Sequence, residues 1–235
     1  MIFSENPSFC WRYCGYEIIF VSSIPLAKAA ELGERLAARN INSNTRAMLD
    51  SPLRKETIME RIFSFDAETN GLWGDAFAIS AAVYEDGKLV TSFTAYLGPD
   101  GVTDGWVKEN ILPKLGGLAK THDSYDDMLA SFSEFYLAHK KDADVIAHMG
   151  VPVEAKLLLD MHQKGLIGDW DGPYPFLDVA GLLKARGYDP TSVDSYNKEF
   201  GLMNANDVPE AEGLTTHHPL YDSVAAARAY MHLIG

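Results

Sequence analysis

The chain has 235 residues, which is enough for one large domain or for a domain with a short extension. With 47% hydrophobic residues, 11% aromatic residues and a formal net charge of -13, it excludes a disordered chain, a collagen-like repeat and a bundle of membrane helices. Its apolar runs are all shorter than the ~18 residues that a membrane span needs, so no membrane association is expected. Two cysteines exclude a disulfide framework, and no basic segment precedes the first apolar stretch. The expected compartment is therefore the reducing cytoplasm.

The charge is unevenly distributed along the chain. Residues 1–58 carry a net charge of +1, whereas residues 59–235 carry -14. This shift predicts an N-terminal extension of residues 1–58 and a body of residues 59–235. So acidic a body is a poor electrostatic match for long duplex nucleic acid, but it suits carboxylates that hold divalent cations. Because bound cations reverse the local field, a nucleic-acid substrate is not excluded.

The extension shows weaker signals for regular structure than the body. Residues 17–21 are typical of a strand, and residues 25–39 consist of good helix formers after a proline at the helix start. Loop or linker residues follow at 40–44 and 51–52. Two interpretations remain open. Residues 1–58 lie upstream of a natural start at Met59, or they add a strand and a helix that pack on the body.

The body opens with three expected strands, at residues 61–65, 77–84 and 89–97. Asn70-Gly71 and Asp86-Gly87 supply the turns between them, so the strands form a meander.

Helical and strand patterns then alternate. We expect a short helix at 106–112 stopped by Pro113, a longer one at 124–139, a buried strand at 144–148 and a helix at 152–164. Regular structure restarts at 176–183, with Asp178 as the N-cap of a helix over 179–185, and a helix over 221–233 closes the chain. A three-strand meander followed by α-β-α predicts an α/β fold of three layers around a mixed central sheet.

Two acidic residues follow the first strand of the body, in the segment FDAETNG. Because side chains alternate along a strand, Asp66 and Glu68 point to the same face, about 7 Å apart. Two carboxylates on one face at a strand end can share one or two divalent cations. The alternative is a solvated strand end.

The segment HHPLYDSVAAA contains an HxxxxD pattern from His217 to Asp222. Two other segments match this pattern, at residues 122–127 and 139–144, so position has to separate them. Asp222 enters a helix whose alanines permit close packing on a sheet, and the histidine precedes that helix on a loop. The alternative is an ordinary exposed histidine.

A third acidic candidate lies in VIAHMGVPVEAKLL. His148 ends a predicted strand, and Glu154 lies in the first turn of the next helix. The helix dipole alone would favour a glutamate there, and His148 could be either a ligand or a buried structural histidine.

The order of these motifs resembles that of the DEDD superfamily of 3′–5′ exonucleases, in the branch with a catalytic histidine. DAETNG resembles the first motif of that superfamily and HHPLYDSVAAA the third, and the resemblance covers residues 60–233. GWVKENILPKL and FLDVAGLL are similar to segments of its small bacterial and phage exoribonuclease-like branch. The middle motif departs from the family, which usually has aspartate where Val153 stands, with Glu154 next in line.

The resemblance implies an RNase H-like core and hydrolysis that depends on two Mg²⁺ or Mn²⁺ ions. The residues that would hold the ions are Asp66, Glu68, Glu154 and Asp222. His217 would be the general base, and the counterpart of the tyrosine in the other branch of the family would be His218. Residues expected to bind substrate are Thr69, Leu72 and His148, while Trp73 and Trp106 would either stack on bases or pack in the core.

The leading hypothesis is therefore a metal-dependent 3′–5′ exonuclease that acts on the 3′ end of single-stranded RNA or DNA. One alternative is a catalytically weak RNase H-like domain that serves as a protein-binding adaptor, which the unusual middle acid and the acidic body motivate. Another is a phosphohydrolase that uses the same carboxylates on nucleotides. RNA versus DNA stays open, and related small exonucleases suggest a homodimer.

Overall fold

The computed structural model describes residues 12–13, 16–17, 61–204 and 208–235. The chain divides into two compact units, Met1–Glu56 and Thr57–Gly235. In the first unit, β1 (Arg12–Tyr13) pairs antiparallel with β2 (Tyr16–Glu17), so only Glu17 of the strand predicted at 17–21 lies among the described residues. The helix predicted at 25–39 lies outside the described residues. The role of residues 1–58 as an extension therefore stays a prediction.

The second unit is built on a five-stranded mixed sheet. Its strands are β3 (Arg61–Thr69), β4 (Ala76–Glu85), β5 (Lys88–Tyr96), β6 (Ala143–Ala147) and β7 (Phe176–Asp178). They lie in the order β5-β4-β3-β6-β7. Strand β4 is antiparallel to both of its neighbours, β5 and β3, whereas β6 and β7 are parallel to β3. The predicted meander is thus confirmed.

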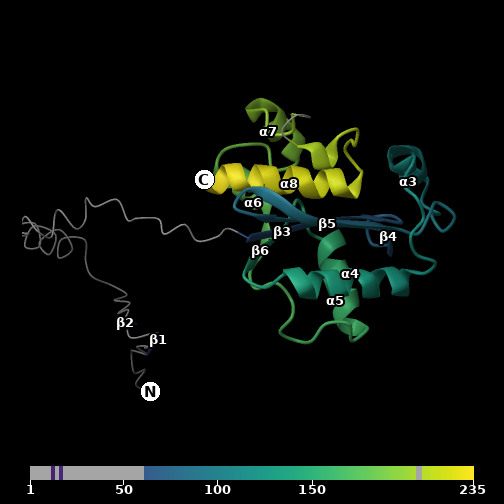
Figure 1. Cartoon of the computed structure of the whole chain (residues 1–235), viewed down its shortest axis with the longest axis horizontal. Helices are drawn as coiled ribbons and strands as arrows, with labels where there is room; N and C mark the ends of the chain where they lie inside the picture. Colours follow the sequence, from purple (N-terminus) through teal and green to yellow (C-terminus); the bar gives the residue numbers. More distant parts are fainter. Residues whose placement is uncertain (1–11, 14–15, 18–60, 205–207) are drawn as a thin grey trace, which may run out of the picture. The chain divides into compact units, whose positions relative to one another are not determined.

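Helices cover both faces of this sheet (Figure 1). In the view of Figure 1, α6 (Val179–Ala185), α7 (Val193–Phe200) and α8 (Pro219–Ile234) lie above the sheet, and α4 (Tyr125–His139) and α5 (Val153–Gln163) lie below it. The short helix α3 (Gly105–Asn110) lies at one end, on the side where α8 begins. These are the three layers of an RNase H-like α/β fold, as predicted.

Three local predictions differ from the structure. Strand β3 continues past residue 65 to Thr69, so the acidic pair lies within the strand. Pro113 does not stop the helix, because α3 has already ended at Asn110. Pro113 belongs instead to a 3-10 turn, Leu112–Leu115. Proline is tolerated at the start of such a turn because the first N–H groups have no hydrogen-bond partner within the turn. Helix α7 was not predicted, although Ser192 caps its start and Gly201 ends it at φ 65°.

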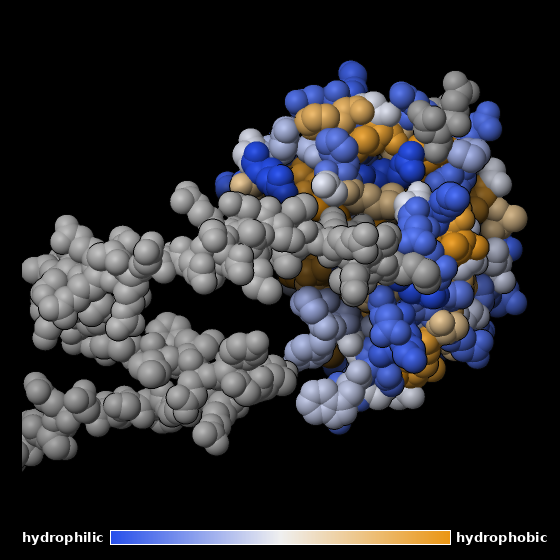
Figure 2. All heavy atoms as spheres, turned by 60° about the vertical axis from the view of Figure 1, so that its left-hand side comes forward, coloured by the Kyte–Doolittle hydropathy of each residue, from blue (hydrophilic) through white to orange (hydrophobic). Residues whose placement is uncertain are grey.

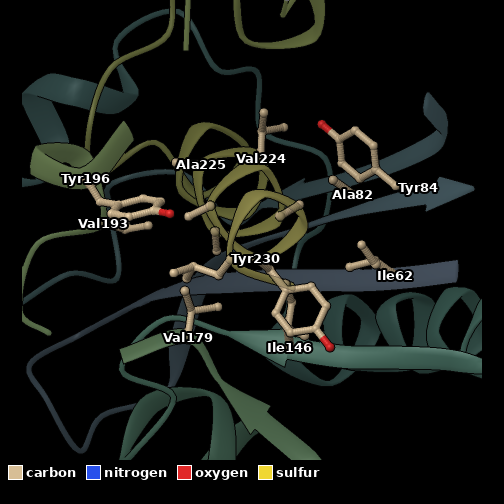
Figure 3. Packing of buried hydrophobic residues seen from close by; sticks show 14 of the residues in the cluster. Ile62, Ala82, Tyr84, Ile146, Val179, Val193, Tyr196, Val224, Ala225 and Tyr230 are labelled. Atoms are coloured by element: carbon tan, nitrogen blue, oxygen red, sulfur yellow. The ribbon is translucent and has the colours of Figure 1, made fainter. Parts of the chain in front are cut away.

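The two faces of the sheet are packed differently. Below the sheet, large aromatic rings such as those of Phe63, Phe65 and Phe132 contact one another, with ring centroids 5.7 to 6.4 Å apart. Above it, the small side chains of α8 and Ala82 of β4 belong to one buried cluster, and Figure 3 shows Val224 on the side of α8 nearer to Ala82 and Ala225 on the side nearer to Tyr196. Small residues let the axis of α8 approach the sheet closely.

Hydrogen bonds fix α8 at this close distance. Ser64 Oγ of β3 donates to the carbonyl of Ser223 at 2.7 Å, and Ser223 Oγ lies 3.1 Å from the carbonyl of Ser80 in β4. All three serines are fully buried. Because Ser223 follows Asp222 directly, these bonds also set the position of that carboxylate relative to β3.

The surface of the second unit mixes hydrophilic and hydrophobic residues on the face drawn in Figure 2. None of the helices among the described residues is both long and apolar enough to cross a membrane.

The close packing of α8 leads to a stability prediction. Ala227 is fully buried and lies one turn after Ser223, on the side of α8 that faces the sheet, so Ala227→Leu should lower the free energy of unfolding by about 1–3 kcal/mol through overpacking. The matched control is Ala185→Leu, at an exposed helix position, which should change it by less than about 0.5 kcal/mol. Urea unfolding followed by circular dichroism measures both, and equal effects would contradict the close approach of α8.

Candidate active site

One end of β3 carries the acidic pair. Asp66 and Glu68 lie two residues apart in the strand, opposite Ser80 and Ala78 of β4, and a register shift follows at Thr69. The side chains therefore project from the same face of the sheet, as the sequence predicted. Both line a cavity of about 420 Å³.

Three other parts of the chain bring their predicted residues to this cavity. They are the first turn of α5, the first turn of α8 and the loop before α8, which contribute Glu154, Asp222 and His217. Four carboxylates and one imidazole thus come from segments nearly 160 residues apart in sequence. The assignment of catalytic roles to them stays a prediction.

Glu154 reaches β3 directly. Its side chain is 3% exposed, and Oε1 accepts a hydrogen bond from the backbone N–H of Ala67 at 3.1 Å. This contact places the carboxylate beside the residue that separates Asp66 from Glu68. Val153, which stands at the usual position of the family's aspartate, lines the cavity as an apolar residue. Glu154, and not its neighbour Val153, thus brings a carboxylate from α5 to β3, and its replacement of the family's aspartate stays a prediction.

Asp222 and His217 are linked through the backbone. Asp222 Oδ2 accepts from the N–H of His217 at 2.8 Å, and His217 adopts a φ of 69°. The imidazole Nδ1 lies 3.8 Å from Glu68 Oε1. One ligand atom from each of these three residues lies within 4.8 Å of the others, a spacing at which the three could hold one cation.

His218 has a different environment from its neighbour. It is 7% exposed and caps α8, where its Nδ1 accepts from the N–H of Leu220 at 3.3 Å. It does not line the cavity. Of the two adjacent histidines, only His217 faces the carboxylates.

Burial makes the acidic site electrostatically costly. It is the main cause that raises the pKa of Asp66 and Asp222 well above the usual value; the charge of Glu154 adds to the shift of Asp66, and the charges of Asp66 and Asp194 add to that of Asp222. Burial and the three neighbouring carboxylates raise the pKa of Glu68 to about 10. Burial raises the pKa of Glu154 to about 8, although the hydrogen bond from Ala67 opposes the shift. Such a set binds protons or cations in place of remaining fully charged.

The donor set fits a hard divalent cation. The cavity is lined by carboxylate oxygens, and no lysine or arginine among the described residues lines it to neutralise them. Mg²⁺ and Mn²⁺ prefer such oxygen ligands. The residues present therefore fit the ions that the sequence predicted.

The residues predicted to bind substrate are distributed over two cavities. His148 lines the acidic cavity, but its Nε2 already contacts the carbonyl of Pro190 at 2.9 Å. Thr69 and Leu72 line a neighbouring cavity of about 350 Å³ together with Trp106, whose ring stands edge-on to His217 at 6.2 Å. Trp73 is exposed and lines neither.

Asp178 has the predicted N-cap role and a second one. Its Oδ1 accepts from the N–H of Ala180 at 2.9 Å. The same carboxylate accepts from the N–H groups of Met149 and Gly150, at 3.0 and 3.2 Å. It therefore also orders the loop that carries Met149 into the cavity.

Sequence reasoning missed two carboxylates near the site. Asp194 lines the acidic cavity from the unpredicted helix α7, and it accepts a hydrogen bond from Tyr221 Oη at 3.2 Å. Asp104 lines the neighbouring cavity. The N-cap signal of Ser192 could have revealed α7, but nothing local in the sequence places Asp104 beside β3.

Comparisons with known proteins give likenesses among solved structures alone. No protein-family model matches the chain, and no curated protein matches it. Among solved structures, it is similar to one described as "Exonuclease X in complex with 5' overhanging duplex DNA". The identity is 21%, the TM-score is 0.45, and the match covers 75% of this chain and 91% of the other. These values establish no function, so we argue function from the site.

The shifted pKa of Glu154 predicts how stability depends on pH. Its pKa in the folded protein lies above the unfolded value, so the stabilisation is complete below pH 4.5 and is lost as pH rises to about 8. At pH 8.5 without metal, Glu154→Gln should therefore raise the melting temperature, by ~3 °C or more. At pH 5 the two proteins should melt nearly together.

The matched control is Glu134→Gln, at an exposed position of α4. It should leave the melting temperature unchanged at both pH values. Differential scanning calorimetry in EDTA measures all three proteins. A Glu154→Gln variant that is less stable than wild type at pH 8.5 would contradict the electrostatic account.

Proposed function

We propose that this protein is a metal-dependent 3′–5′ exonuclease that hydrolyses phosphodiester bonds of single-stranded RNA or DNA. The observation that carries the proposal is the convergence of four carboxylates, of which Glu154 is buried and the other three are partly buried, and His217 in one cavity. A structural cluster would pair such carboxylates with basic side chains, because unpaired buried charges destabilise a fold. In a cation-binding site, by contrast, the carboxylates lack basic partners because the bound cations neutralise them.

Each carboxylate has a place in this scheme. Asp66 would contact both ions, Glu68 and Asp222 would complete one ion's ligands, and Glu154 would hold the second, in part through water. When bound, two divalent cations neutralise charge on the attacking and leaving oxygens and lower the pKa of a water molecule. Because these ligands come from β3, α5 and α8, the packing of the three elements would fix the positions of the ions.

His217 is the residue assigned to accept the proton of the attacking water. Burial lowers the pKa of its imidazole below the usual value, so the ring is neutral and basic at pH 7. Nδ1 faces Glu68, which leaves Nε2 as the nitrogen assigned to the proton. The backbone bond to Asp222 keeps the loop, and hence the ring, beside the carboxylates.

The polymer substrate and the 3′ polarity follow from the motif resemblance. The cavity that contains Leu72 and Trp106 supports this proposal, because it adjoins the acidic cavity and offers apolar and aromatic walls to a terminal base.

The direct experiment is shortening of 5′-labelled single-stranded RNA and DNA with Mg²⁺, Mn²⁺ or EDTA. Stepwise, metal-dependent shortening supports the proposal. Hydrolysis of free nucleotides without shortening would indicate the nucleotide phosphohydrolase. No hydrolysis with any metal would favour the adaptor.

The carboxylates should be required for hydrolysis but not for folding. Asp66→Asn and Asp222→Asn each remove a metal ligand and should abolish shortening, with circular dichroism unchanged. The matched control, Asp123→Asn, changes a carboxylate that is 94% exposed and should retain full activity. Activity that persists in both site variants would rule out this assignment.

The adjacent histidines should behave differently. His217→Ala should lower the rate of hydrolysis by about 10²–10⁴, because the general base is lost. His218→Ala removes a helix cap and should cost about 0.5–2 kcal/mol in stability with a nearly unchanged rate. Single-turnover kinetics and urea unfolding separate the two effects. The opposite pattern would show that the base is His218.

A further inference from the structure

The cavity beside the acidic site has one polar wall among apolar ones. It has a volume of about 350 Å³, within the ~300–1,000 Å³ range of ligand pockets. It shares Glu68 and His217 with the acidic cavity, so the two adjoin. Leu72 and Trp106, which are 62% and 59% exposed, flank it, and Asp104 is its other carboxylate.

Only one oxygen of Asp104 is used within the protein. Oδ1 accepts from the N–H of Val107 at 2.9 Å as the N-cap of α3. Oδ2 has no hydrogen-bond partner within the described part of the chain. It lies over Gly71, where an added Cβ would come within 3.2 Å of it. Gly71, at φ 78°, thus leaves room for a carboxylate oxygen at the cavity wall.

Asn70 holds Asp104 in this position. Its Oδ1 accepts from the N–H groups of Thr103 and Asp104, both at 2.9 Å, and its Nδ2 donates to Thr103 Oγ1 at 3.1 Å. Asn70 follows β3, the strand that carries Asp66 and Glu68. The loop that contains Asp104 is therefore tied to the end of the strand that supplies the acidic pair.

We propose that Asp104 selects the base at the 3′ end of the substrate: its Oδ2 accepts a hydrogen bond from the exocyclic amino group of adenine or cytosine. A carboxylate only accepts hydrogen bonds, so it pairs with an amino group and repels a carbonyl. Uracil and hypoxanthine have no amino group and would place a carbonyl there. Leu72 and Trp106 provide the surfaces between which the base lies. This inference rests on the proposed exonuclease function for the identity of the ligand.

Matched pairs of 3′-terminal bases test the selection. Adenine and hypoxanthine are purines of the same shape, and so are the pyrimidines cytosine and uracil. Wild-type protein should remove terminal adenosine at least about tenfold faster than inosine, and cytidine faster than uridine, because one charge-assisted hydrogen bond is lost.

Asp104→Asn reverses the polarity of the wall while retaining the helix cap. Asn Oδ1 can still accept from Val107, which leaves the amide NH₂ where Oδ2 was. The ratio of adenosine to inosine removal should fall below one. Asp104→Ala should bring it close to one. Asp100→Asn, an exposed position in the same loop, is the matched control and should keep the wild-type ratio.

Binding of 5′-AMP and 5′-IMP provides a second readout that requires no hydrolysis. Calorimetric titration in Ca²⁺ should show tighter binding of 5′-AMP to wild type, and the reverse for Asp104→Asn. If oligonucleotides are not shortened but this preference holds, the exonuclease proposal fails, and the selection of an amino-bearing base by Asp104 stands for a nucleotide ligand. If shortening proceeds with an adenosine to inosine ratio of one, the inference fails and the exonuclease stands. Equal binding of both nucleotides, or of neither, also overturns it.

Discussion

The site depends on how closely α8 approaches the sheet. Buried serines bridge the helix to β3 and β4, and small residues on the same side of α8, such as Ala227, add little side-chain bulk between them. Because Asp222 lies one residue before Ser223, this packing holds its carboxylate near Asp66 against their mutual repulsion. The energy of packing above the sheet and of the aromatic cluster below it offsets the cost of the buried charges. The closely packed contact between α8 and the sheet thus supports the electrostatically unfavourable carboxylate cluster.

Without cations, the same carboxylates work against the fold. Their raised pKa values mean that each proton lost as pH rises removes stability, and only a bound cation or proton relieves the repulsion. We therefore expect metal loading, stability and activity to be coupled in this protein. A bound divalent cation would stabilise the folded state by mass action, by an amount that rises with the logarithm of its concentration relative to the Kd. The acidic site would therefore bind the cations and would also be stabilised by them.

Periodicity and motif spacing predicted most of the architecture, because the signals are local. Alternation in β3 placed Asp66 and Glu68 on one face, and the small residues after Asp222 predicted a helix close to the sheet. Other features depend on tertiary contacts. Glu154 meets Ala67 only through the placement of α5 below β3, and Asp104 reaches its cavity only because Asn70 binds the loop. Helix α7 has only eight residues, too few for a clear helical pattern in the sequence. Because the helix was not predicted, the position of Asp194 in its first turn was not predicted either.

The most direct test of the account is a crystal structure of the full chain grown with Mn²⁺ and 5′-AMP, with anomalous diffraction recorded at the manganese edge. The account predicts anomalous peaks in the cavity that Asp66, Glu68, Glu154 and Asp222 line, with the phosphate of the nucleotide beside them and His217 facing it. A cavity that holds no anomalous peak at millimolar Mn²⁺, with the nucleotide absent or bound elsewhere, would contradict it. In that case the carboxylates would be a protonated structural cluster.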